Sequence, residues 1–222
     1  MIDALDIIQN NRELLTRALL VTIYLNCLSV LLSLVLGVFI GMAREYGGHI
    51  TYVVLGAFVD VIRSIPILVI IIWTFFGLPL ILGLQNFPPL VAAVIALGVH
   101  SGVYISEVVR GGLASVRQGQ WQAGIALGMT PIMVVRRIIL PQAAIRMLPP
   151  ISSRVIRNIK DSALAATIAA PELFWASNTL EGETAKPFPI YTTLMIFYFL
   201  FNLGVARGLD QIYSRVAIRG RA

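Results

Sequence analysis

Residues 120–141 of this 222-residue chain read QWQAGIALGMTPIMVVRRIILP, a polar stretch with arginines that is set between strongly apolar segments. Gly128 is typical of a left-handed helix end, and Thr130 followed by Pro131 is typical of a helix that begins there. We therefore expect two short helices that meet at a sharp corner. A long structured loop in an otherwise apolar chain indicates a docking surface.

The composition is that of a membrane protein. Hydrophobic residues make up 58% of the chain and charged residues only 13%, about half the charged share of a typical soluble domain. The net charge of +6 indicates membrane orientation in preference to nucleic-acid binding. The single cysteine, Cys27, rules out a disulfide framework or a cysteine-based metal cluster. We predict one all-α integral membrane domain over residues 1–222.

Apolar segments long enough to cross a bilayer recur along the chain. We predict five spans, at about 19–42, 52–82, 90–109, 148–171 and 188–206. The fourth is the least apolar, because its first half contains Arg154, Arg157, Lys160 and Asp161. With five spans and the N-terminus outside, the arginine-rich loop and the arginine-rich C-terminal segment both face the cytoplasm, as the positive-inside rule requires. Only Arg12, Arg17 and Lys186 then lie outside.

Two glycine pairs, Gly37/Gly41 and Gly98/Gly102, have the spacing that lets helix backbones approach closely. We expect tight packing inside one subunit, with a dimer interface as the alternative.

Catalytic residues are scarce. His100 and Ser101 are neighbours on a helix and point about 100° apart, so they cannot form a dyad. Neither lysine, Lys160 or Lys186, is followed by the Ser or Thr of a Walker A loop. The sequence therefore predicts neither an enzyme nor a cofactor or metal on this chain.

Polar side chains recur at helical spacing within the spans. His100, Tyr104 and Glu107 share one face of the third span, and Arg154, Arg157 and Asp161 share one face of the fourth. Ionisable groups at such depth line a pathway or pair with protein groups. A purely structural alternative is that Glu107 pairs with Arg63 or Arg110 while His100 packs against its neighbours.

The second span contains Arg63-Ser64-Ile65-Pro66. Pro66 has no N–H and clashes with the carbonyl of Ile62, which loosens the helix at that point. Transporters use such breaks to bind substrates, whereas the alternative is a simple kink.

The loop resembles the cytoplasmic EAA motif of ABC-importer permeases, which reads Glu-Ala-Ala, three residues, Gly, nine residues, Ile-x-Leu-Pro. Gln122-Ala123-Gly124, Gly128 and Ile138-x-Leu140-Pro141 keep every interval. The resemblance to the polar amino-acid branch (His, Glu, Gln, Arg and opine) extends over nearly the whole chain, from Arg63-Ser64-Ile65-Pro66 to Lys160-Asp161-Ser162. Two positions differ, because Gln122 replaces the leading Glu and Gly124 the second Ala. Gln122 cannot form an ion pair.

The resemblance implies the permease subunit of an ATP-driven amino-acid importer in a bacterial inner membrane, with a coupling-helix loop at about 115–141 between the third and fourth spans. It implies three partners: a cytoplasmic ATPase, a second permease subunit that is identical or similar, and an extracytoplasmic amino-acid-binding protein. The residues expected to contact the ATPase are Gln122, Ala123, Gly124, Leu127, Gly128, Met129, Thr130 and Pro131. By position and polarity, the candidates for the amino-acid site are Ser64, Ile65, His100, Tyr104, Glu107 and Asp161.

A competing hypothesis is an ion-gradient-driven carrier in which Glu107 and Asp161 relay protons. This hypothesis explains the charges within the spans but assigns no function to the structured loop. The substrate's side chain is left open, because Arg63, Arg154, Arg157 and Lys160 are all possible partners of the two acids. Acidic, basic and amide amino acids are all compatible with this sequence.

Overall fold

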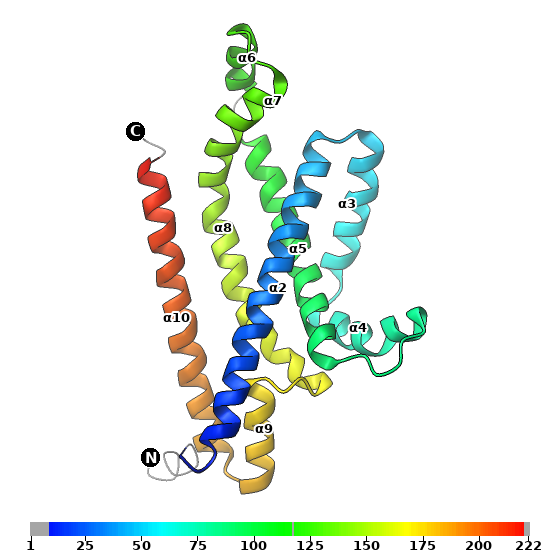
Figure 1. The fold of residues 1–222 in the computed structure, drawn as a ribbon, viewed down its shortest axis with the longest axis vertical. Coiled ribbons are helices and arrows are strands. Elements are labelled where there is room, and N and C mark those ends of the chain that lie inside the picture. Colours follow the sequence, from blue (N-terminus) through cyan, green and yellow to red (C-terminus); the bar gives the residue numbers. More distant parts are fainter. Residues whose placement is uncertain (1–8, 117, 220–222) are drawn as a thin grey trace.

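A computed structural model describes residues 9–116 and 118–219, and every regular element within these ranges is helical (Figure 1). The helices from residue 12 onward are α2 (Arg12–Tyr46), α3 (His49–Ser64), α4 (Ile67–Leu82), α5 (Pro89–Ala114), α6 (Gln118–Ala126), α7 (Pro131–Val134), the π-helix η1 (Val135–Ile139), α8 (Leu140–Asp161), the 3₁₀-helix η2 (Ser162–Ile168), α9 (Leu173–Thr184) and α10 (Pro187–Arg219). The all-α prediction is confirmed.

Four long helices, α2, α5, α8 and α10, follow the long axis of the molecule (Figure 1). Helices α6 and α7 lie at one end, and α9 lies at the other end, beside the start of α2. Helix α10 runs from the α9 end toward the end that carries α6 and α7. The molecule therefore has two distinct ends, with the predicted docking loop at one of them.

Helices α2 and α5 pack closely because glycines of each helix lie against side chains of the other. A Cβ placed on Gly98 would lie 2.5 Å from Cδ2 of Leu32, and one placed on Gly37 would lie 2.5 Å from Cγ2 of Ile105. A side chain at either position would force the facing residue to move. Both predicted small-residue pairs thus serve packing within the subunit.

The predicted break at Pro66 is present. Ile65 leaves helical geometry, α4 begins after Pro66, and the axes of α3 and α4 differ by 103°. Each of the two helices has 16 residues, fewer than the roughly 20 needed to cross a bilayer alone. Residues 52–82, predicted as one span, therefore form two helices with a sharp bend between them.

Three helices in the described part of the chain are long and apolar enough to cross a membrane, namely α2, α5 and α10, or four if the bent pair α3–α4 is one span. Helix α8 is too polar to count by this criterion. Its polarity is turned inward: Arg154 and Asn158 are buried, and Asn158 accepts a hydrogen bond from Ser101 of α5 at 2.7 Å. Asn158 also donates to Ser29 of α2 at 2.8 Å. A buried polar seam thus joins α8 to both central helices.

The segment between α5 and α8 contains the predicted corner. Gly128 has φ +77°, and the Thr130 side chain accepts a hydrogen bond from the backbone N–H of Met133 at 3.4 Å. The π-helix η1 then joins α7 to α8 without a break. Arg146 of α8 donates to the carbonyl and hydroxyl oxygens of Ser115, which ties the two ends of the loop together.

Candidate functional site

A cavity of about 480 Å³ lies between α5 and α8, next to the start of α4. Three of the predicted site residues line it: His100 and Tyr104 from α5, and Asp161 from the end of α8. The other lining residues are Ile67, Val108, Pro150, Ser153, Arg154 and Arg157. The cavity is therefore built where the two predicted polar faces meet the helix break.

Arg154 is the centre of the polar contacts in this cavity. Its Nη2 lies 2.8 Å from Nδ1 of His100, and its guanidinium carbon lies 4.2 Å from the centre of the Tyr104 ring. A guanidinium only donates hydrogen bonds, so Nδ1 of His100 is the acceptor and the imidazole is neutral. The carboxylate of Asp161 lies 4.0 Å from Nη2 of Arg154, too far for a hydrogen bond.

Tyr104 lies between two arginines. The guanidinium carbon of Arg63, from the end of α3, lies 5.1 Å from the centre of the Tyr104 ring. The rings of His100 and Tyr104 meet edge to face, with centroids 5.2 Å apart. Arg63, an exposed cation near the end of α3, thus lies beside Tyr104 of α5.

Glu107 belongs to a different cluster. Its carboxylate accepts hydrogen bonds from Arg44 of α2 and, at 3.0 Å, from Nη2 of Arg110. It does not line the cavity that holds His100 and Asp161. The pairing with Arg110 is the structural alternative anticipated above for this residue. The bond from Arg44 joins α2 to α5.

Ser64 and Ile65 do not line the cavity either. The Ser64 hydroxyl donates to the carbonyl of Asp60 at 2.7 Å, and Ile65 packs against an apolar cluster. Arg154 and Arg157, by contrast, line the cavity although they were not among the predicted site residues. Their shared helical face with Asp161 was the signal that pointed to them.

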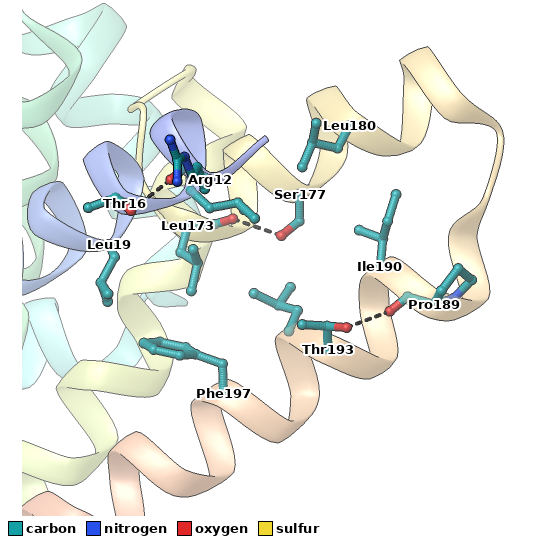
Figure 2. A pocket seen from close by; sticks show the side chains of 12 residues that line it. Arg12, Thr16, Leu19, Leu173, Ser177, Leu180, Pro189, Ile190, Thr193 and Phe197 are labelled. Carbon is teal, nitrogen blue, oxygen red and sulfur yellow. Dashed lines mark hydrogen bonds between the residues drawn. The ribbon is translucent and has the colours of Figure 1, made fainter. Parts of the chain in front are cut away.

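A second cavity, of about 230 Å³, lies between the start of α2, α9 and the start of α10 (Figure 2). Its lining is mainly apolar. The Thr16, Ser177 and Thr193 hydroxyls donate to carbonyls one turn earlier in their own helices. The protons of these three hydroxyls are therefore used within their own helices.

A third carboxylate, Glu172, is fully buried between η2 and α9. It caps α9 by accepting hydrogen bonds from the N–H groups of Phe174 and Trp175, at 2.9 and 2.7 Å, and from the Tyr198 hydroxyl at 3.2 Å. Burial raises the pKa of Glu172 to about 7, and its hydrogen bonds oppose that shift.

The predicted docking loop presents apolar side chains on both sides of its corner. Leu127 is 80% exposed and Ile132 is 79% exposed. Gly124 is buried, and a Cβ at this position would lie 2.7 Å from Cγ2 of Val134. Glycine at this position therefore allows α6 to rest directly on α7, whereas Gln122 and Ala123 are exposed.

The chain is similar to known proteins along most of its length. Residues 33–218 match the family described as "Binding-protein-dependent transport system inner membrane component". The chain is 33% identical to the glutamine transport system permease protein GlnP of Escherichia coli strain K12, over 89% of this chain and 90% of that protein. It is 31% identical to the L-cystine transport system permease protein TcyL of Bacillus subtilis, over 83% of this chain and 80% of that protein.

Solved structures agree with these relatives. A chain from the crystal structure of an amino acid ABC transporter with histidines has a TM-score of 0.85 and 28% identity, covering 94% of this chain and 96% of that one. A chain of the MetNI methionine ABC transporter in an inward-facing conformation has a TM-score of 0.79 and 23% identity, covering 92% of this chain and 97% of that one. The second likeness establishes the fold alone.

Proposed function

The chain belongs to the family of binding-protein-dependent transport system inner membrane components, and we propose that it forms the translocation pathway of an ATP-driven amino-acid importer. Relatives named for glutamine and L-cystine transport support an amino-acid substrate. The chain is a permease subunit, and ATP hydrolysis belongs to a partner chain. It needs no cofactor of its own.

The helices support a membrane arrangement with five spans. The bent pair α3–α4 counts as one span and α8 with η2 as another, which gives five spans in a single domain. The opposite positions of the start of α2 and the end of α10 support an odd number of spans (Figure 1). The positive-inside rule then places the N-terminus outside and the C-terminus and the loop in the cytoplasm.

One observation carries the coupling role: two large apolar side chains, Leu127 and Ile132, are about four-fifths exposed on either side of a fixed corner. Exposed apolar surface of this kind marks a contact with a protein or a membrane, and a loop at the cytoplasmic end of the molecule favours a protein. We assign Gln122, Ala123, Gly124, Leu127, Gly128, Met129, Thr130 and Pro131 to the ATPase contact. Gln122 contributes hydrogen bonds there but no ion pair.

The other partners are a second permease subunit and an extracytoplasmic amino-acid-binding protein. Exposed apolar residues of α4, including Trp73, Phe76 and Leu80, support a further membrane-embedded contact with lipid or with that second subunit. The amino acid itself binds in the cavity of His100, Tyr104 and Asp161.

The decisive experiment combines copurification with transport in reconstituted vesicles. Gly128→Pro replaces a residue with φ +77° by one restricted to about −65°. We expect the variant to insert into the membrane but to lose ATPase copurification and uptake. Gly83→Pro, at the other described glycine of positive φ, is the matched control and should keep the ATPase.

The competing hypothesis, an ion-gradient-driven carrier, predicts that uptake depends on the proton gradient and not on ATP. Uptake that continues without ATP and stops when the proton gradient is removed would overturn the proposed function. The geometry gives a proton relay little support, because Glu107 and Asp161 contact different arginines in different clusters.

A further inference from the structure

The sequence leaves the charge of the substrate cavity open, because Glu107 and Asp161 share several possible basic partners. The structure resolves this pairing. Glu107 is held by Arg44 and Arg110 outside the cavity, while Lys160 lines a different cavity between α8 and α10. Among the described residues that line the substrate cavity, Asp161 is thus the one acid, and Arg154 and Arg157 are the two bases.

The cavity is therefore cationic. His100 is neutral because its Nδ1 accepts from Arg154, so the lining has a net charge of +1. Arg63, which stacks on Tyr104, adds a further positive charge at the edge. A cavity of one sign concentrates ligands of the opposite sign.

The arginines also have unused hydrogen-bonding capacity. A guanidinium has five N–H donors, and the hydrogen bond that Arg154 makes to a lining residue of this cavity, from Nη2 to His100, uses one of them. Arg157 is exposed and lines the cavity next to it. Carboxylates are the ligands that a guanidinium binds best, through two parallel hydrogen bonds.

We infer that this cavity selects amino acids with a net negative charge, those with a second carboxylate in the side chain. This inference rests on the function proposed above. Asp161 receives the α-ammonium group, and the arginines receive the two carboxylates. A cationic amino acid would meet Arg154, Arg157 and Arg63 with only Asp161 to compensate, and an amide would leave one guanidinium without an anionic partner.

The test measures binding to the permease–ATPase complex in lipid nanodiscs, without the binding protein, so that the selectivity of that protein does not contribute. The probe is labelled L-glutamate, displaced by unlabelled L-glutamate, L-aspartate, L-glutamine or L-arginine. We expect L-glutamate and L-aspartate to displace the probe at least tenfold better than L-glutamine, and L-arginine not to compete. The preference should shrink at high salt.

Arg157→Gln should reduce the preference for L-glutamate over L-glutamine about tenfold. Arg207→Gln, which removes an exposed arginine of α10 outside this cavity, is the matched control and should keep the preference. If Arg157→Gln fails to assemble, the wild-type panel still decides the question.

Two results separate this inference from the proposed function. ATP-driven uptake of glutamine or arginine, with that amino acid bound more tightly than glutamate, would overturn the inference and leave the importer intact. A complex that moves no amino acid with ATP would overturn the proposed function, and the inference with it.

Discussion

Helix α5 takes part in two clusters of arginine and carboxylate that differ in how completely the charges are paired. Glu107 is hydrogen-bonded to both Arg44 and Arg110, and the Arg44 side chain is buried. Asp161 stands 4.0 Å from Arg154, and nearby Arg157 is exposed. In the first cluster each carboxylate oxygen of Glu107 accepts from an arginine, and the bond from Arg44 joins α2 to α5, although Nε of Arg44 has no hydrogen-bond partner among the described residues. The second keeps donors available for a ligand. We therefore expect the doubly hydrogen-bonded carboxylate of Glu107 to serve structure and the carboxylate of Asp161, which has no hydrogen bond from Arg154, to serve binding.

The strongest test of this contrast is Glu107→Gln. The variant leaves the buried Arg44 without its counter-charge, which costs about 4 kcal/mol. We expect a fall of roughly 10 °C in the melting temperature of the detergent-solubilised protein, or failure to assemble. Glu13→Gln, which removes the carboxylate of an exposed ion pair with Arg17, is the control and should have almost no effect. A stable Glu107→Gln protein with altered substrate affinity would place Glu107 in the site after all.

Glu172 extends the comparison to a buried carboxylate whose hydrogen bonds come from two backbone amides and a phenol. Its folded pKa of about 7 lies above the ordinary value of 4.5, so the folded state favours the protonated form. Its contribution to stability is therefore fully present below pH 4.5 and is lost as the pH rises through 7. The shift corresponds to about 3 kcal/mol.

The measurement is the melting temperature of wild type and Glu172→Gln between pH 4.5 and 8. The wild type should lose several degrees relative to the variant over this range. Parallel curves for the two proteins would show that Glu172 does not titrate there.

A double-mutant cycle measures how strongly Arg44 and Glu107 stabilise each other. Arg44→Met combined with Glu107→Met removes both charges, so no buried charge is left without a partner. We expect the double variant to be about 2 kcal/mol more stable than the sum of the two single changes predicts, measured by thermal denaturation. Additive effects would mean that Arg44 and Glu107 do not stabilise each other.

The smallest change in stability is expected for Asp161→Asn. Because the Asp161 carboxylate makes no hydrogen bond to Arg154, its loss should cost less than about 1 kcal/mol. Uptake should nevertheless fall at least tenfold, because the substrate's ammonium group loses its counter-charge. The measurements are the melting temperature and the initial rate of ATP-driven uptake. An unfolded variant, or one with normal uptake, would contradict the assignment.

Much of the fold could be predicted from local sequence. The break at Pro66, the corner at Gly128 and the close packing at Gly98 depend on backbone constraints that one or two residues impose. Helix α8 is harder to predict as a membrane span, because average hydropathy does not show that its polar side chains point into the bundle. The assignment of α8 as the fourth span stays a prediction.

The site was only partly predictable, because helical spacing gives the face of a residue but not its partner. Glu107 shares a face with His100, yet seven residues separate them by about 10 Å along the helix. At that distance the nearest cation comes from α2, a helix distant in sequence. The sequence shows that Arg154 and Arg157 share a helical face with Asp161. It does not show that the two positive charges of this face exceed its negative charge, because that requires the partners of the other charged residues to be known.

The π-helix η1 sets the direction in which the side chains of α6 and α7 point around the axis of α8. A π turn holds one residue more than the α-helical turn it replaces, and each residue of an α-helix advances the direction of its side chain by about 100°. Deleting one residue from 135–139 would let α7 and α8 merge into one regular helix. Leu127 and Ile132 would then swing about 100° around the axis of α8, so a change in register alone would turn the surface that we propose for the ATPase contact in another direction.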